Sequence, residues 1–215
     1  MAVGCLFYRI AIDPLLNSLR RDIEQLIPVN SQVLEIGSGT GSQAFLLTVK
    51  GRKVVGIDKN QNMTACAQKR ARKRKFDEVE FFNTDASSLS NISDGQFMTA
   101  TVTLAMHEMP HAVRKAVLKE MKRTAHTLIV ADYSVPLPRN AAGAFVKLIE
   151  CAAGGEHYAG FRDYQKRNGL LQLFSELGLQ IVKSRLTLKK TVTIYVLSSS
   201  NTNNSTDDIP DSASL

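Results

Sequence analysis

Five short apolar segments constrain the fold of this chain more than any other feature. Each is rich in Val, Ile, Leu, Phe or Thr and is bounded by turn residues, which is typical of strands. Three of the four stretches between them are expected to contain helices, at 44–50, 61–75 and 111–125. Alternating strands and helices favour a parallel sheet with helices on both faces, an α/β fold. The segments are QVLEI (32–36), KVVGI (53–57), VEFFN (79–83), FMTATVTLA (97–105) and TLIVAD (127–132).

Further elements are expected on either side of this alternating region. Asp13-Pro14 is typical of a helix start, with Asp13 as the capping residue, and this helix should end near Pro28. Two helices (139–154 and 162–177) should follow the fifth segment, and residues 179–188 and 191–198 should close the chain as antiparallel strands. We therefore predict one domain over residues 1–197, with an insertion at about 134–178 that covers the site, and a disordered polar tail over 198–215.

The composition narrows the class of protein. The chain of 215 residues is 44% hydrophobic and 22% charged, as soluble globular proteins are, and it has no apolar run long enough to span a membrane. The first residues lack the pattern of a signal peptide. Cys5, Cys66 and Cys151 are odd in number and far apart, which predicts free thiols and a cytoplasmic location. The net charge of +7 leaves open an anionic partner or a solvated basic surface.

A glycine-rich turn follows the first strand and opens the next helix. This arrangement lets a ligand approach the backbone and places its anionic part at a helix N-terminus. The spacing is G-x-G-x-G at Gly37, Gly39 and Gly41, with Ser42 where a dinucleotide fingerprint would have its third glycine, and Glu35 precedes the turn. The run VLEIGSGTG therefore resembles the E/D-x-G-x-G-x-G motif of class I S-adenosylmethionine (SAM) methyltransferases. The resemblance covers about residues 1–197.

The resemblance implies a Rossmann-like sheet, mostly parallel with an antiparallel C-terminal strand, and SAM as cofactor. Asp58 ends the second strand, where a carboxylate would bind the ribose hydroxyls. The remaining cofactor-binding residues follow from the family pattern alone. They are Asp85 and Ala86 near the adenine, the backbone at Leu104 near the methionine part, and Tyr8 as an aromatic cover, with Glu35 and the three glycines of the turn.

The sequence His107-Glu108-Met109-Pro110-His111 reads H-E-x-x-H, the signature of a zinc protease helix. Proline disfavours a continuous helix, so Pro110 should begin a new one and leave His107 in the preceding loop. The zinc protease geometry therefore fails, and no metal site is predicted. His107 becomes the candidate catalytic base or substrate contact, because the loop after the fourth strand borders the methyl-transfer site in this family.

The stretch GGEHYAGFRDY (154–164) is rich in aromatic residues and lies within the insertion. We expect it to line the pocket of a small organic substrate, with an arginine available for an anionic group. The alternative is an aromatic core beneath the covering helices. The candidate substrate residues are His157, Tyr158, Arg162 and Tyr164, together with Tyr133 just after the fifth strand.

The predicted function is SAM-dependent methyl transfer to O, N or C of a small molecule. A nucleic-acid or protein methyltransferase is the first alternative, because the run QKRARKRK (68–75) is strongly basic; a solvated helix face is the simpler interpretation of that run, and nucleic acid is not the expected partner. A non-catalytic SAM-binding module is the second alternative. Oligomeric state is not predictable from these features.

Overall fold

The computed structural model describes residue 10 and residues 12–198. Its strands are β1 (Gln32–Ile36), β2 (Lys53–Asp58), β3 (Val79–Asn83), β4 (Phe97–Thr103), β5 (Ala125–Tyr133), β6 (Gln180–Thr187) and β7 (Val192–Ser198). The α-helices are α2 (Asn17–Glu24), α3 (Ser42–Leu47), α4 (Gln61–Arg74), α5 (His111–Thr124), α6 (Ala141–Ala153), α7 (Gly155–Lys166) and α8 (Leu171–Glu176). Short 3-10 turns are η2 (Asp13–Leu16), η3 (Met106–Glu108) and η4 (Leu188–Lys190).

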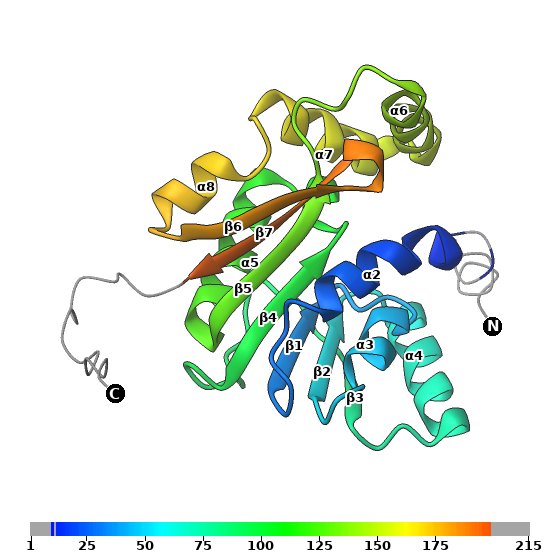
Figure 1. Cartoon of the computed structure of the whole chain (residues 1–215), viewed down its shortest axis with the longest axis vertical. Helices are drawn as coiled ribbons and strands as arrows, with labels where there is room; N and C mark the ends of the chain where they lie inside the picture. The colour runs from blue at the N-terminus through cyan, green and yellow to red at the C-terminus, as the bar shows by residue number, and fades with distance from the viewer. Residues whose placement is uncertain (1–9, 11, 199–215) are drawn as a thin grey trace, which may run out of the picture.

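The strands form one twisted sheet in the order β3-β2-β1-β4-β5-β7-β6 (Figure 1). Strands β1 to β5 pair in parallel, whereas β7 pairs antiparallel with both β5 and β6. The order in which strands are added to the sheet reverses between β1 and β4, and the carboxyl ends of these two parallel strands lie side by side. Ligands of open α/β sheets bind at such a point.

Helices cover both faces of the sheet and bury its apolar strands. One core joins residues of β1, β4 and β5 to α5 and α8. The other, on the opposite face, joins residues of β1 and β5 to α2, α3 and α4. Helices α6 and α7 lie beyond the carboxyl end of β5, where they cover one end of the sheet (Figure 1). The predicted three-layer α/β class is confirmed, and within the described residues no helix is long and apolar enough to cross a membrane.

The insertion differs from the predicted pair of helices. It contains three helices. Residues 155–161, which lie between the two predicted helices, belong to α7. Gly154 and Gly155, with φ of 66° and 52°, separate α6 from α7, and Asn168 and Gly169, with φ of 57° and 71°, separate α7 from α8. These left-handed backbone positions end helices, which a pattern of apolar spacing alone does not reveal.

The predictions for the cysteines, for Tyr8 and for the C-terminal tail have different outcomes. Cys66 is disulfide-bonded, so the prediction of three free thiols is wrong at that residue, while Cys151 is a free and exposed thiol. The prediction of a cytoplasmic location, which was argued from three free thiols, therefore loses that support. Tyr8 and the tail beyond Ser198 lie outside the described residues.

Candidate active site

The turn after β1 is built from glycines in conformations that other residues rarely adopt. Gly37, Gly39 and Gly41 have φ of 68°, 53° and 78°. A Cβ added to Gly41 would stand 2.6 Å from the ring of Phe81, so that glycine is also required by packing. The amide of Gly39 donates to Oδ2 of Asp58 at 2.8 Å, which ties the turn to the end of β2. Oδ1 of the same carboxylate accepts the amide of Asn60 at 2.8 Å.

Glu35 lies buried on β1, two residues before the turn. Its Oε2 has no hydrogen-bond partner in the described part of the chain. Burial, with a smaller contribution from Asp58, raises the pKa of this carboxyl to about 8, although Arg20 opposes the shift. A buried carboxyl oxygen without a partner is costly, and a bound ammonium group would relieve that cost.

The N-terminal helical segment is joined to the glycine turn through Asp13. Its Oδ1 forms an ion pair with Arg20 at 2.6 Å. Its Oδ2 accepts from the hydroxyls of Ser42 at 2.5 Å and Thr40 at 3.3 Å. The prediction that Asp13 caps the helix is wrong, because Ile12 occupies the capping position and the Asp13 side chain is used for this junction.

The basic run on α4 also contacts the turn at one point. Arg70 Nη1 donates to the carbonyl of Thr40 and, at 2.9 Å, to the hydroxyl of Ser42. Its guanidinium stacks over Phe45, 4.9 Å from the ring centroid. The neighbouring Lys69 and residues 72–75 are exposed. The prediction that this run is a solvated helix face is therefore wrong at Arg70, which contacts the glycine turn.

Asp85 and Ala86 follow the end of β3, as the family pattern requires. Oδ1 of Asp85 accepts the amide and the hydroxyl of Ser87 at 2.8 and 2.7 Å. These hydrogen bonds, aided by Lys59, lower the pKa of the Asp85 carboxyl. Ala86 is half-buried and packs against the core.

The end of β4 adjoins the glycine turn. A Cβ added to Gly37 would lie 3.2 Å from the Cβ of Ala105. Leu104 has φ of 49°, an uncommon value for a leucine, and its amide donates to the carbonyl of Ala131 at 2.8 Å. The segment that carries His107 thus starts at the glycine turn.

The histidine of this segment is held by Asp132 at the end of β5. Nδ1 of His107 lies 2.7 Å from Oδ1 of Asp132, and both side chains are buried. Oδ2 of Asp132 accepts the amides of Met106 and His107 at 2.8 and 3.1 Å, and Oδ1 accepts the amide of Tyr133 at 2.7 Å. Because this carboxylate only accepts, Nδ1 of His107 is the donor.

Glu150, Glu108, His157 and Tyr133 lie on the other side of the His107 ring. Nε2 lies 3.6 Å from Oε1 of Glu150 and 3.9 Å from Oε1 of Glu108. Oε2 of Glu150 lies 2.7 Å from Nε2 of His157, and its Oε1 accepts the hydroxyl of Tyr133 at 2.9 Å. Burial disfavours the imidazolium of His107, but the carboxylates of Asp132, Glu108 and Glu150 outweigh this effect and raise its pKa.

The side chains around His107 form a polar cluster, which includes only part of the predicted substrate residues. Tyr133 and His157 belong to it, whereas Tyr164 is buried and donates its hydroxyl to the carbonyl of Tyr133 at 2.9 Å. Tyr164 therefore packs in the core. Tyr158 and Arg162 instead line a surface cavity of about 710 Å³ whose lining does not include the cluster.

Sequence reasoning missed three residues that organise the cluster: Asp132, Glu150 and Arg114. Asp132 directly precedes a predicted site residue, and Glu150 is the one acidic residue of a mostly apolar helix, so each left a weak signal. Arg114 is fully buried on α5 and gave no signal, because it resembles the other basic residues of that helix.

The H-E-x-x-H run is divided as predicted. Residues 106–108 form η3, Met109 is extended with φ −80° and ψ 146°, and α5 begins at His111. Pro110 occupies the capping position of α5, one residue earlier than predicted. His107 and His111 therefore lie on separate elements, and the zinc protease helix does not form.

The strand order, the antiparallel β7 and the glycine turn after β1 together define the class I methyltransferase architecture. A SAM-dependent methyltransferase from Aquifex aeolicus matches with a TM-score of 0.66 at 16% identity, over 91% of this chain and 97% of that one. Magnesium protoporphyrin IX methyltransferase from Synechocystis PCC 6803, solved with bound S-adenosylhomocysteine, matches with a TM-score of 0.63 at 18% identity, over 93% and 89% of the two chains. At such identities the likeness establishes the fold.

The sequence assigns the domain more directly. Residues 33–127 match the family described as "Methyltransferase domain". A candidate methyltransferase of Geobacillus sp. (strain WCH70) is 34% identical over 68 residues, which are 32% of this chain and 27% of that relative's length. Residues 33–127 therefore match a methyltransferase domain, and the class I fold that the sequence resemblance implied is confirmed.

Proposed function

We propose that this protein binds SAM and transfers its methyl group to a small organic molecule. The observation that carries the proposal is the glycine turn linked through Gly39 to Asp58, at the reversal point of a methyltransferase-domain sheet. Such a turn can cradle the methionine and ribose parts of the cofactor, because its backbone has no side chains in the way.

Each polar group of the cradle has a matching group on SAM. Glu35, whose Oε2 lacks a partner among the described residues, accepts from the ammonium of the methionine part. Asp58 accepts from the ribose hydroxyls, in exchange for one of its present backbone contacts. Asp85 and the amide of Ala86 bind the adenine, and the backbone of Leu104 contacts the methionine part. These assignments follow the family pattern and the positions of the residues at the strand ends.

The polar cluster around His107 forms the acceptor side of the proposed site. The His107 segment starts at Ala105, against Gly37, so it lies next to the turn that holds the cofactor. In the reaction, a lone pair of the acceptor forms a bond to the methyl carbon while the carbon–sulfur bond breaks and sulfur keeps its electron pair. A proton on the acceptor leaves to His107 or to solvent. In-line positioning supplies much of the rate, because the sulfonium is already a good leaving group.

The covering helices favour a small acceptor over a polymer. Helix α7 packs so closely on η3 that a Cβ on Gly160 would stand 2.4 Å from the carbonyl oxygen of Glu108. His107 and Glu150 are each 2% exposed, which leaves little room for a protein or nucleic-acid strand. The exposed basic residues of α4 are the observation that favours RNA as the alternative substrate.

Calorimetry with SAM and S-adenosylhomocysteine tests the cofactor assignment. We expect binding of both at micromolar concentration, and absence of binding to either would refute it. Incubation with methyl-labelled SAM and a metabolite extract, compared with an RNA pool, tests the acceptor class. Label in RNA alone would favour the alternative. SAM binding without label in any pool would favour a non-catalytic module.

A further inference from the structure

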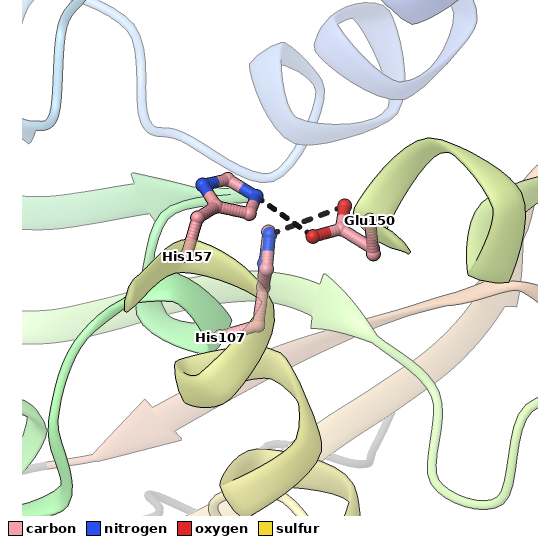
Figure 2. Close-up of side chains that lie close together, drawn as sticks. All are labelled: His107, Glu150 and His157. Carbon is pink, nitrogen blue, oxygen red and sulfur yellow. Dashed lines mark hydrogen bonds and ion pairs between the residues drawn. The ribbon is translucent and has the colours of Figure 1, made fainter. Parts of the chain in front are cut away.

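Three side chains of the proposed acceptor side form a cluster with the composition of a metal site. His107, Glu150 and His157 each offer one ligand atom, and these atoms all lie within 4.8 Å of one another. They come from η3, α6 and α7, and Figure 2 shows both imidazole rings directed at the Glu150 carboxylate. We call these residues the His-Glu-His cluster.

The hydrogen bond to Asp132 prepares His107 as a ligand. With Nδ1 donating to Asp132, Nε2 is the nitrogen that faces the cluster, where a bound metal ion would take the place of its proton. Carboxylate oxygens of Glu150 and Glu108 lie 3.6 and 3.9 Å from Nε2. A positive charge between Nε2 and these carboxylates is favourable, and a metal ion supplies one. Metal-binding histidines commonly donate their second nitrogen to a carboxylate in this way.

The local charge balance also favours a cation. Asp132 and Glu150 are buried, Glu108 is half-exposed beside them, and these three carboxylates surround two imidazoles. The Arg114 guanidinium lies behind the backbone of the same segment, but it forms an ion pair with Asp163 at 2.9 Å. Buried charges of one sign are normally paired or bound to metal.

We propose that the His-Glu-His cluster binds a divalent transition-metal ion of the Zn²⁺ type. Two imidazoles and one carboxylate suit such ions, whereas Mg²⁺ prefers oxygen ligands. In a tetrahedral site the ligand atoms stand about 3.3 Å apart. His107 Nε2 lies 3.6 Å from Oε1 of Glu150 and His157 Nε2 lies 2.7 Å from Oε2, so the carboxylate stands between the two imidazoles and the shorter contact opens slightly as the ion replaces its proton. Tyr133 orients Glu150 through the hydrogen bond to Oε1.

The metal site indicates the chemical class of the acceptor. This part rests on the proposed function. Three protein ligands leave a position for an oxygen of the substrate, and coordination lowers the pKa of a hydroxyl. The hydroxyl proton leaves to solvent, the oxygen forms its bond to the methyl carbon, and the carbon–sulfur bond breaks. A small alcohol, phenol or enol is therefore the acceptor.

Metal binding is tested on the full chain after dialysis against a chelator. Titration with ZnCl₂ should give one tight site per chain, and MgCl₂ should bind at least 100-fold more weakly. His157→Ala and Glu150→Gln should each weaken zinc binding at least 10-fold. Co²⁺ should give the visible absorption bands of a four- or five-coordinate site, and these should disappear in His157→Ala.

Matched variants separate this site from other zinc ligands. His111→Ala removes the second histidine of the H-E-x-x-H run, and Cys151→Ser removes the thiol next to Glu150 in sequence; both should bind zinc as the parent does. Because His157 is half-exposed, its variant should keep the circular dichroism spectrum and melting temperature of the parent. Zinc binding unchanged in both cluster variants, or lost only in Cys151→Ser, would overturn the proposal.

The metal and cofactor assignments fail independently. Zinc binding is measured without SAM, and SAM binding is measured on the metal-free chain. Zinc bound at the cluster with no affinity for SAM would leave the metal site standing and reject the methyltransferase function. SAM binding without a zinc site would do the reverse.

Discussion

Asp132 holds His107 from two sides. One oxygen binds the ring nitrogen Nδ1 at 2.7 Å, and the other accepts the backbone amide of the same histidine at 3.1 Å. One carboxylate at the end of β5 therefore fixes both the backbone and the ring of a residue that follows β4. This relationship determines which nitrogen of His107 faces the proposed acceptor side.

Replacement of His107 should separate methyl transfer from cofactor binding. We expect His107→Ala to lose at least 100-fold in turnover, while its affinity for SAM stays within about twofold of the parent. Turnover is measured with methyl-labelled SAM and an acceptor found in the extract. His111→Ala, on α5 and outside the cluster, serves as the control. Full activity of His107→Ala would leave that residue a structural role only.

Asp58 should control affinity for SAM. Asp58→Ala removes the acceptors for the ribose hydroxyls and the hydrogen bond from Gly39. Hydrogen bonds to charged groups contribute about 1.5–3 kcal/mol each, so we expect binding to weaken at least 10-fold. Calorimetry measures the change, with Asp77→Ala, in the exposed turn before β3, as the control. Equal affinity in the two variants would remove Asp58 from the site.

Glu35 should make stability depend on pH. Its pKa is about 8 in the folded chain and ordinary in the unfolded chain, so between about pH 4.5 and 8 the unfolded state binds fewer protons. The free energy of unfolding therefore decreases as pH rises through this window, by at most about 1.4 kcal/mol per unit from this group, and levels off above pH 8.

Urea unfolding of the parent and Glu35→Gln from pH 5 to 8 measures this contribution. The variant keeps the size of the side chain but does not ionise. The difference in free energy between the two proteins should change steadily with pH and favour the variant at pH 8. A difference that is constant over this range would contradict the buried neutral carboxyl.

Arg114 should stabilise the packing of α7 on η3. Its guanidinium donates to the carbonyls of Met106 and Gly160 at 3.0 and 2.7 Å and binds Asp163, and its side chain is fully buried. Arg114→Met removes the donor to both carbonyls and leaves Asp163 with Arg167 alone, and we expect a loss of about 3–5 kcal/mol in the free energy of unfolding.

Arg162→Met, at an exposed position on α7, is the matched control for this prediction. Surface changes of that kind stay within about 0.5 kcal/mol. Both variants are compared by urea unfolding. Similar stabilities would show that the contacts of Arg114 contribute little.

Strands and the glycine turn were predictable because their signals are local. The segment 79–83 is an apolar run between turn residues, and the structure gives a strand with the same bounds. Asp58 directly follows such a run, so its place at the sheet edge follows from the strand alone. Pro110 similarly divides the H-E-x-x-H run whatever surrounds it, since proline acts on its own backbone and its neighbours.

Residues that meet through helix packing were not predictable. His107 and His157 are 50 positions apart in the sequence. They share Glu150 only because α6 and α7 cover the ends of β4 and β5. Asp13 matched a helix cap by its sequence context, yet tertiary contacts with Arg20 and Ser42 use the same carboxylate.

The sequence by itself determined the order of the strands, the class I methyltransferase fold and the position of the glycine turn. These depend on apolar periodicity and on backbone preferences that act over a few residues. Only the tertiary structure decided that His107 faces Glu150 and His157, that Tyr164 packs in the core, and that Arg114 holds the cover in place. Those contacts depend on how distant helices pack, which no local pattern encodes.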